Sequence, residues 1–414
     1  MDGGTRHYIL LFAMAASTAT AMHYIAPGKH SYHNLDYRKN PTESEESVKS
    51  VLHPGTIEGN DTILCSWGKW LPELYLLGAP KCATSDLSLQ LVHNGIQSSV
   101  NISGYSFNDP DLLKKDVPYL GEKESQFFQG WLYTHNGTWD VEEALQDWWY
   151  YQAWCPAYVF EGSGMPVQRT LFAEYTPLNL GLVPPDSSIS GKLVTAWGYD
   201  LAGIYLPRTL AYFYGELSPK LSFIVMLREP LAQLQSSWYH AHHILTHAEV
   251  NSTQLVGDLP LESSFPAELA RALNLADHGT MQLWLWYSYY GRQVQAYLSI
   301  FAASQFVFIP MYYFLHKARE EVCATLQERL RYPISCQEVG PSINTHDHPS
   351  LEEDLPATSA LRARFEAFMQ PEIERLIQVL HRAYVQGAHL PAFHRHGLRP
   401  VRRRDVQSWL MEGW

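Results

Sequence analysis

Continuous apolar runs alternate with helical patterns through the middle of the chain. The apolar runs predict strands at 73–78, 170–174, 221–227 and 305–309. Helical patterns lie between and after these runs, at 86–94, 204–214, 230–243, 281–301, 315–330 and 359–386. Strands that are apolar throughout and alternate with helices are typical of a parallel sheet covered on both faces. The pattern therefore predicts an α/β fold in three layers, a central parallel sheet flanked by helices.

The pattern changes at both ends of the chain. Residues 8–22 form an apolar run preceded by Arg6 and His7, and this run is shorter than the ~20 residues that cross an average bilayer. Ala19 and Ala21 provide the small residues that a signal peptidase requires. We predict a signal peptide or signal anchor at 1–22, a stem or linker at 23–70, one large domain at 71–390 and a basic C-terminal tail at 391–414.

Composition excludes several classes of protein. Hydrophobic residues make up 46% of the 414 residues and charged residues 17%, so the chain can form a full core and is not disordered throughout. A single early apolar run excludes a multi-pass membrane protein. The 30 basic and 42 acidic residues give a net charge of −12, which argues against a protein that coats nucleic acid.

Sequons and cysteines agree with entry into the secretory pathway. Four asparagines stand in Asn-x-Ser/Thr sequons: Asn60, Asn101, Asn136 and Asn251. The cysteine count of five is odd, so at least one thiol stays unpaired in an oxidising compartment. Cys323 and Cys336 bracket a short segment and could close a small disulfide loop. The cysteines and histidines show no zinc-binding spacing, and we predict no metal.

The segment 73–94 carries the strongest chemical signal. An apolar strand runs into the loop Ala79-Pro-Lys-Cys-Ala-Thr-Ser85, and a helix follows. A short loop that enters a helix directs backbone N–H groups and the helix dipole at one point, where an anion can bind. Lys81 adds a cation, and Thr84 and Ser85 add hydroxyl donors. The spacing differs from a Walker A loop, and the alternative interpretation is an ordinary strand–helix turn with an exposed lysine.

A second strand–helix corner favours the anion-binding interpretation of the first. Arg228 ends the strand at 221–227, Pro230 suits a first helical turn, and Ser236 follows about two turns later. A guanidinium at the strand end and a hydroxyl on the next helix can converge on one phosphate. Anionic ligands of open α/β sheets bind at these carboxyl ends. The alternative is that Arg228 only pairs with a neighbouring carboxylate.

Together the two corners resemble the Golgi carbohydrate sulfotransferases, which use 3′-phosphoadenosine 5′-phosphosulfate (PAPS). Pro80-Lys-Cys-Ala-Thr-Ser85 resembles their 5′-phosphosulfate loop, and Leu227-Arg-Glu-Pro230 with Ser236 resembles their 3′-phosphate motif. Gly121-Glu-Lys-Glu-Ser-Gln-Phe-Phe128 and Ala173-Glu-Tyr-Thr-Pro177 are similar to intervening elements of the heparan and chondroitin types. Tyr289-Tyr-Gly-Arg-Gln-Val294 and Phe306-Val-Phe-Ile309 resemble their late helix and strand. The Lys-Cys start of the loop is most similar to the N-acetylgalactosamine 4-sulfate 6-O-sulfotransferase branch.

The resemblance implies a P-loop-like fold, PAPS as co-substrate, a glycan acceptor and no nucleic-acid partner. It places the protein in the Golgi lumen, as a single-pass type II membrane protein or secreted, with membrane contact through the N-terminal segment if that segment is not cleaved. Lys81, Glu124 and Lys123 become the candidate catalytic residues, with Glu124 as the base. The candidate donor-binding residues are Lys81, Cys82, Ala83, Thr84, Ser85, Asp86, Arg228 and Ser236.

The chain departs from the family pattern at several positions. Ala83 stands where the family has glycine, so this residue must avoid a positive φ or accept strain. Gln233 replaces a second arginine, which should weaken binding of the 3′-phosphate, and Tyr175 replaces a lysine. The Lys/Gly-rich loop expected near 337–348 is replaced by Gly340-Pro-Ser-Ile-Asn-Thr-His-Asp-His348.

These departures keep a second hypothesis open, a lumenal glycan-binding protein on a degenerate sulfotransferase scaffold. A nucleotide-kinase-like phosphotransferase is a third, but it would need a Walker A loop and a paired magnesium-binding Asp. The histidines at 240, 242, 243 and 247 favour a polar cleft wall or a pH-sensitive surface over a metal site. The aromatic runs at 148–151 and 284–287 favour core packing over sugar stacking.

Overall fold

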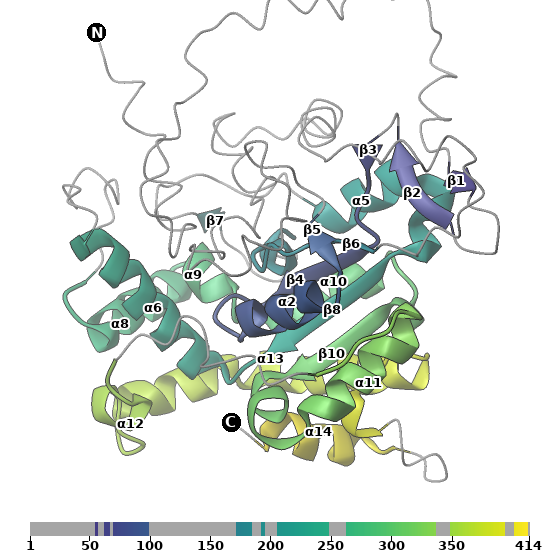
Figure 1. Ribbon diagram of the computed structural model, residues 1–414. Helices are drawn as coiled ribbons and strands as arrows, with labels where there is room; N and C mark the ends of the chain where they lie inside the picture. Colours follow the sequence, from purple (N-terminus) through teal and green to yellow (C-terminus); the bar gives the residue numbers. More distant parts are fainter. Residues whose placement is uncertain are drawn as a thin grey trace, which may run out of the picture.

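The computed structural model describes nine stretches of the chain. They are residues 54–56, 62–66, 69–98, 171–183, 192–194, 205–247, 262–336, 348–393 and 401–412. Together they contain the predicted strand–helix units (Figure 1).

A five-stranded sheet forms the centre of the molecule. Its strands are β4 (Leu74–Gly78), β5 (Gln97–Ser98), β6 (Phe172–Glu174), β8 (Ser222–Leu227) and β10 (Phe306–Pro310). Their order across the sheet is β10-β8-β4-β6-β5, and every neighbouring pair is parallel. Every residue of β4, β8 and β10 is buried, as expected for strands covered on both faces.

The strand order creates a switch point between β4 and β8. The chain leaves β4 through α2 (Thr84–His93) toward β5 at one edge of the sheet. It leaves β8 through α6 (Pro230–His247) and reaches β10 at the opposite edge. The two connections diverge from adjacent strands, so the carboxyl ends of β4 and β8 lie at the position where open α/β sheets commonly bind ligands.

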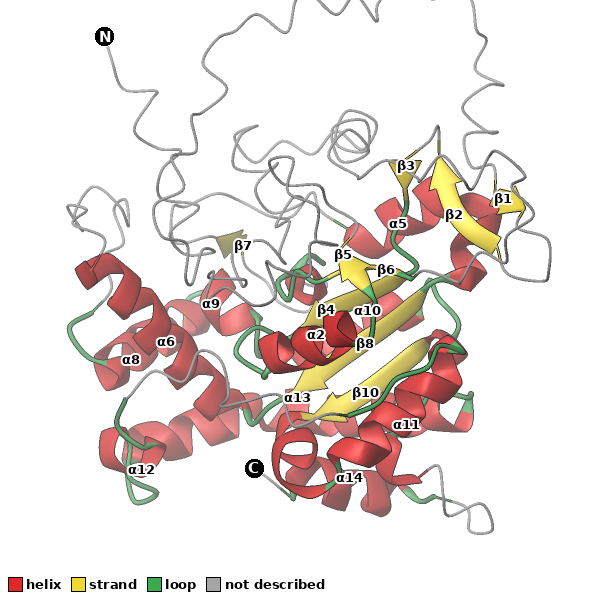
Figure 2. Cartoon of the chain, in the orientation of Figure 1, coloured by secondary structure: helices red, strands yellow, loops and turns green. Residues whose placement is uncertain are grey.

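Helices complete the layers. They are α5 (Leu206–Tyr214), α8 (Phe265–Asp277), α9 (Leu283–Trp286), α10 (Tyr290–Leu298), α11 (Arg319–Leu330), α12 (Leu351–Asp354), α13 (Ala360–Val385) and α14 (Arg403–Met411). The helices α2 and α11 lie on one face of the sheet, and α10 and α13 lie on the other (Figures 1 and 2). The predicted α/β fold with a central parallel sheet is therefore confirmed.

Two smaller sheets lie beside the main one. β1 (Pro54–Thr56), β2 (Thr62–Ser66) and β3 (Lys69–Trp70) form an antiparallel sheet. These strands fall within the predicted stem at 23–70, so ordered structure begins before residue 71. β7 (Lys192–Val194) and β9 (Thr280–Gln282) pair in parallel.

The long helix predicted at 281–301 is wrong. Its first residues belong to β9, and helices α9 and α10 are separated by a turn at residues 287–289. The Trp286 indole donates to the Gly181 carbonyl at 2.9 Å, and the Ser288 hydroxyl donates to Gln233 at 2.6 Å. Tertiary hydrogen bonds thus hold the break that local periodicity does not reveal.

The helix predicted at 315–330 is also divided. A π-helical turn spans Tyr313–Lys317, and α11 begins at Arg319. Ala318 between them has an extended φ of −151°. The disulfide proposed from the spacing is confirmed, since Cys323 in α11 is bonded to Cys336.

The C-terminal residues need a correction as well. They were predicted as a basic tail, but Arg403–Met411 form α14, which packs on α13 and buries Val406, Trp409 and Leu410. A segment after α13 also extends the sheet. The His389 N–H donates to the Phe306 carbonyl and the Phe308 N–H donates to the His389 carbonyl, at 2.9 and 3.0 Å.

The structure describes no helix that is long and apolar enough to cross a membrane. Residues 1–22, predicted as a signal peptide or anchor, lie outside the described stretches, and so do the four sequon asparagines.

Candidate functional site

The first corner follows β4, where the chain turns sharply into α2. Gly78 has a φ of +146°, and a Cβ atom at this position would lie 2.3 Å from the Pro177 carbonyl oxygen. Only glycine fits both the dihedral angle and the close approach. The chain that follows β6 is therefore packed directly against the start of the loop at 79–83.

Two residues of this loop have left-handed backbone conformations. The φ angles of Lys81 and Ala83 are 62° and 58°. Ala83 is also the N-cap of α2 and has no side chain to cap the first-turn N–H groups. Of the two outcomes expected for an alanine in place of the family's glycine, the structure shows the strained one.

The second corner follows β8. Pro230 opens α6, and the Glu229 carboxylate accepts hydrogen bonds from the backbone N–H of Leu231 at 2.9 Å and from that of Ala232. This is an N-cap provided by a side chain. Burial raises the pKa of Glu229, while the two backbone hydrogen bonds and Arg228 oppose that rise.

The two corners are in contact. The Arg228 guanidinium donates through Nη1 to the Lys81 carbonyl at 2.9 Å, across 147 positions of sequence. The Gln233 amide donates through Nε2 to the Pro80 carbonyl at 3.2 Å. Register explains the meeting, since Leu76 lies beside Ile224 and the Ala79 N–H donates to the Met226 carbonyl at 2.8 Å. The two predicted loops therefore lie in contact at the switch point of the sheet.

The residues predicted to bind the donor differ in exposure. Lys81, Ala83, Ser85, Asp86, Arg228 and Ser236 are half-buried. Thr84 is buried at the first position of α2. Ser236 lies on α6, the helix that also carries Gln233.

Cys82 differs from its neighbours because its side chain points into the protein. The thiol is completely buried and lies 3.9 Å from the Tyr290 hydroxyl and 3.6 Å from the Pro80 carbonyl. Burial raises the pKa of this thiol to about 12, despite the opposing effect of Arg228. Only the backbone of Cys82 is placed to contact a ligand of the loop.

Two residues that depart from the family pattern are also buried. Gln233 is fully enclosed, and the Tyr175 hydroxyl donates to the Ile96 carbonyl at 3.0 Å inside the core. Neither side chain faces the open side of the corner. These two departures therefore lie beneath the loop at 79–83, whereas the departure at Ala83 lies within it.

Several predicted residues cannot be placed at the site. Lys123 and Glu124, the aromatic run at 148–151 and the loop at 340–347 lie outside the described stretches. Core packing is confirmed for Trp286 and Tyr287, which are buried.

The histidines of α6 lie beyond the corner. His240 is buried, and His242 stacks on Trp238 with ring centroids 4.9 Å apart. Across the described part of the chain, no three His, Cys, Asp or Glu side chains are grouped to hold a metal ion.

Some residues near the site were not recognised from the sequence. Gln235 and Tyr239 on α6 donate to the two carboxylate oxygens of Asp354 at 2.7 and 3.0 Å, and His348 stacks on Tyr239. These contacts dock α12 beside the site. Burial and the hydrogen bond to Asp354 raise the pKa of Tyr239 to about 12. No local motif marks such contacts, because the pairs are more than 100 residues apart.

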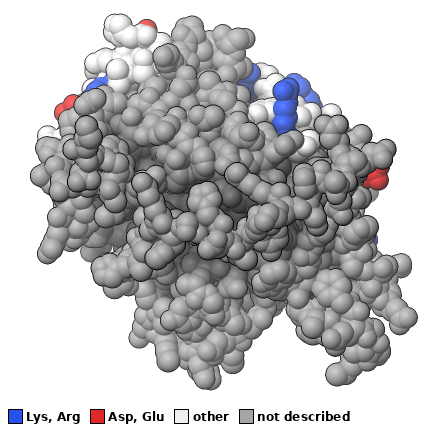
Figure 3. Space-filling view, turned by 90° about the horizontal axis from the view of Figure 1, so that it is seen from above, with Lys and Arg blue, Asp and Glu red and all other residues white. Residues whose placement is uncertain are grey.

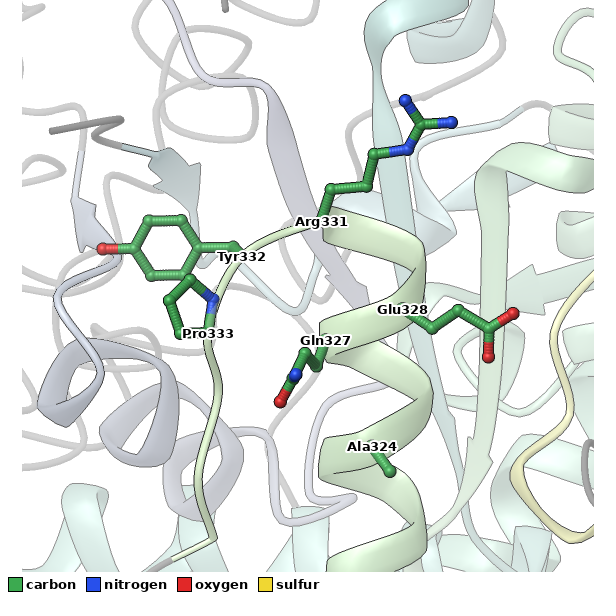
Figure 4. A pocket seen from close by; sticks show the side chains of 6 residues that line it. All are labelled: Ala324, Gln327, Glu328, Arg331, Tyr332 and Pro333. Atoms are coloured by element: carbon green, nitrogen blue, oxygen red, sulfur yellow. The ribbon is translucent and has the colours of Figure 1, made fainter.

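A separate cavity of about 520 Å³ lies at the C-terminal end of α11. Six residues of 324–333 line it (Figure 4): Ala324, Gln327, Glu328, Arg331, Tyr332 and Pro333. A Cβ atom at Gly95 would lie 2.9 Å from the Tyr332 hydroxyl, which places the cavity near the C-terminal end of α2. The loop at 79–83 is at the other end of that helix, so the cavity is not part of this corner.

Viewed from above, the charged side chains of described residues that are visible lie at the border of the face (Figure 3).

The fold and the paired corners define an α/β protein in which two strand–helix corners meet at the switch point of a parallel sheet. No protein-family model and no curated protein matches the sequence. A search of solved structures finds a sulfotransferase from Alicyclobacillus acidocaldarius, whose crystal structure has 18% sequence identity and a TM-score of 0.40. That match covers 78% of this chain and 99% of the other chain.

Proposed function

We propose that this protein is a sulfotransferase that moves a sulfuryl group from PAPS to a hydroxyl of a glycan in the secretory lumen. The contact between Arg228 and Lys81 is the observation that carries the proposal, because it joins the two corners that would bind opposite ends of the donor. The motif resemblance of the two corners supplies the identity of that donor.

The first corner would hold the 5′-phosphosulfate. Lys81 would supply positive charge, and the backbone of Cys82 and Ala83 with the first turn of α2 would supply N–H donors. Thr84, Ser85 and Asp86 occupy that first turn. At the second corner, Arg228 and Ser236 would hold the 3′-phosphate. A guanidinium has five N–H donors, and the Lys81 carbonyl takes one of them.

Sulfuryl transfer follows the logic of phosphoryl transfer, an in-line displacement in which positioning and charge stabilisation dominate. The acceptor oxygen forms a bond to sulfur while the bond from sulfur to the bridging oxygen of the 5′-phosphate breaks. Lys81 would neutralise the charge that develops on the leaving phosphate. Glu124, by resemblance, would take the proton of the acceptor hydroxyl, with Lys123 beside it to contact the sulfonate or an acidic sugar.

The acceptor class rests on the resemblance to the heparan and chondroitin types, so a chondroitin- or dermatan-like chain is the first candidate. Lumenal placement is supported by the apolar segment before residue 23, the four sequons and the disulfide between Cys323 and Cys336. The net charge of −12 makes nucleic acid an unsuitable partner.

Calorimetry with 3′-phosphoadenosine 5′-phosphate (PAP), the desulfated donor, tests the first half of the proposal. Binding supports a donor site, and absence of binding to the folded protein refutes it. Transfer of labelled sulfate from PAPS to a panel of glycans then tests catalysis and identifies the acceptor.

Replacing Lys81 with alanine should lower the transfer rate by about 10²-fold to 10³-fold, which is the usual effect of losing one transition-state charge contact. Lys317→Ala is the matched control, because Lys317 is an exposed lysine paired with Glu412 on the surface. Full turnover of the Lys81 variant would refute its role.

Glu124→Gln should reduce turnover while PAP still binds, because a general base acts on the acceptor and not on the nucleotide. Comparing kcat with the Kd for PAP checks this assignment. Unchanged kcat would show that another group accepts the proton.

The alternative of a glycan-binding protein on a degenerate scaffold drew its support from Gln233 and Tyr175. Both side chains are buried and bonded to backbone carbonyls, so each has a structural role in this fold. The alternative remains an outcome of the PAP experiment: glycan binding without PAP binding would favour it.

A further inference from the structure

Gln233 is the most enclosed polar side chain beneath the loop. Its exposed fraction is 0%, and an amide buried without hydrogen-bond partners would destabilise the fold. Here Nε2 donates to the Pro80 carbonyl at 3.2 Å and to the Ser237 hydroxyl at 3.1 Å, while Oε1 accepts from the Ser288 hydroxyl at 2.6 Å. The orientation of the amide is fixed, because the Pro80 carbonyl can only accept and must face Nε2.

Two consecutive carbonyl groups of the loop are thus held from the same corner. Gln233 binds the carbonyl of Pro80, and Arg228 binds that of Lys81. In a planar trans peptide the C=O of one residue and the N–H of the next point in opposite directions. The N–H groups of Lys81 and Cys82 therefore point away from Gln233 and Arg228, toward the other side of the loop.

Ser288 holds Gln233 in this orientation. It lies in the turn between α9 and α10, where its N–H donates to the Leu285 carbonyl at 3.1 Å. The next helix brings Tyr290 to the inward-pointing thiol of Cys82. The interruption of the predicted long helix therefore places a hydroxyl donor under the loop.

We propose that Gln233 and Ser288 form a positioning pair that sets the direction of the loop amides and so prepares the loop for the 5′-phosphate of the nucleotide. This inference rests on the proposed function and adds residues that would contact no substrate atom. It also reverses the effect expected at position 233, since a glutamine here supports the donor site.

Comparing the binding of two nucleotides distinguishes a positioning role from a general effect on the stability of the protein. PAP carries a 5′-phosphate, and adenosine 3′-monophosphate lacks it. We expect Gln233→Met, which keeps the length of the side chain, to weaken PAP binding about fivefold to tenfold, as for loss of one or two buried hydrogen bonds. Adenosine 3′-monophosphate should bind this variant within about twofold of the wild type, because its phosphate does not use the loop.

The chain offers matched controls. Gln235 is a buried glutamine on the same helix, but its amide binds Asp354 and Pro349. Gln235→Met should therefore leave the ratio of the two affinities unchanged. Ser288→Ala should weaken the binding of PAP, by less than Gln233→Met does, and leave the binding of adenosine 3′-monophosphate unchanged. Ser288→Thr retains the hydroxyl and should bind PAP as the wild type does.

Equal losses of both nucleotides in Gln233→Met and Ser288→Ala would overturn the positioning role and leave the proposed function intact. Failure of the wild type to bind PAP would overturn both. If the variants do not fold, NMR of the wild type decides: the amide signals of Lys81 and Cys82 should shift with PAP and not with adenosine 3′-monophosphate. Unmoved signals at saturating PAP would contradict the inference.

Discussion

At the scale of single residues, the loop after β4 combines strain with enclosure. Lys81 and Ala83 adopt left-handed backbone angles that cost a non-glycine residue about 1–2 kcal/mol each. The surrounding contacts maintain these angles, since Arg228 and Gln233 hold the carbonyls of the loop. Strain that is maintained in this way is frequent where a backbone is shaped for a ligand.

Replacing Ala83 with glycine should raise the free energy of unfolding by about 0.5–1 kcal/mol. Relief of the left-handed strain exceeds the extra chain entropy that glycine adds to the unfolded state. Urea unfolding measures the change. Ala363→Gly in α13 is the control, because an exposed alanine within a helix should lose about 1 kcal/mol on the same change. A loss of stability in both variants would contradict the strain argument.

The buried thiol of Cys82 should resist alkylation. Its pKa is raised from 9.0 to about 12, so the thiolate is scarce at pH 8, and the sulfur is also inaccessible. The pKa of this thiol is higher in the folded protein than in the unfolded chain. Its contribution to the free energy of unfolding is therefore complete below pH 9 and declines as the pH rises from 9 to 12. Peptide mass spectrometry after iodoacetamide treatment checks this. Rapid labelling of native Cys82, at the rate seen in urea, would show that the site is open.

At the scale of elements, the sequence predicts the strand–helix units well because their signals are local. An apolar run, a proline or glycine and a polar loop lie within a few residues of one another at both corners. The contact between the corners follows from a general rule about parallel sheets. The two predicted loops are therefore in contact in the folded protein.

What could not be predicted depends on contacts between distant segments. The turn between α9 and α10 is held by a hydrogen bond between Ser288 and Gln233, which are 55 residues apart. Helical periodicity is a local pattern and does not predict such a contact. The contacts of Gln233 could not be predicted for the same reason, since burial decides whether a polar side chain meets solvent or the backbone. The helix α14 was missed because the basic residues around it resemble a solvated tail.

The segment after α11 should depend strongly on its covalent link. Cys336 forms a disulfide with Cys323. Next to it, the Asn94 side chain accepts a hydrogen bond from the Ser335 N–H through Oδ1 at 2.8 Å and donates to the Ser335 carbonyl through Nδ2 at 2.9 Å. A disulfide that closes a loop of this length contributes about 3 kcal/mol. We expect the double variant Cys323→Ser, Cys336→Ser to lose about that much in urea unfolding. A difference below ~1 kcal/mol would mean that the Asn94 contacts suffice without the link.

At the scale of the whole molecule, the contacting corners after β4 and β8 are surrounded by packed helices, with α12 bonded to α6 and α14 packed on α13. The helices on both faces bury β8 and β10 completely, so the strand ends are held in fixed register. Such a scaffold suits chemistry that depends on placing two phosphate-binding loops at a constant separation.

Expression in a eukaryotic secretory host should yield a glycosylated protein. The apolar segment within residues 1–22 would direct the chain to the lumen, where the four sequons become accessible. Treatment with a peptide N-glycosidase should lower the apparent mass. Recovery of an unglycosylated protein from the cytosol would contradict the lumenal assignment.

The pairing of His389 with β10 has a consequence for solubility. β10 is the last strand on its side of the sheet, and the two hydrogen bonds to His389 occupy backbone groups that would otherwise be available to another chain. A chain truncated before this residue would present an apolar edge, Phe-Val-Phe-Ile, to its neighbours. The residues after α13 thus protect the protein against aggregation through strand addition, a benefit that no measurement of monomer stability would reveal.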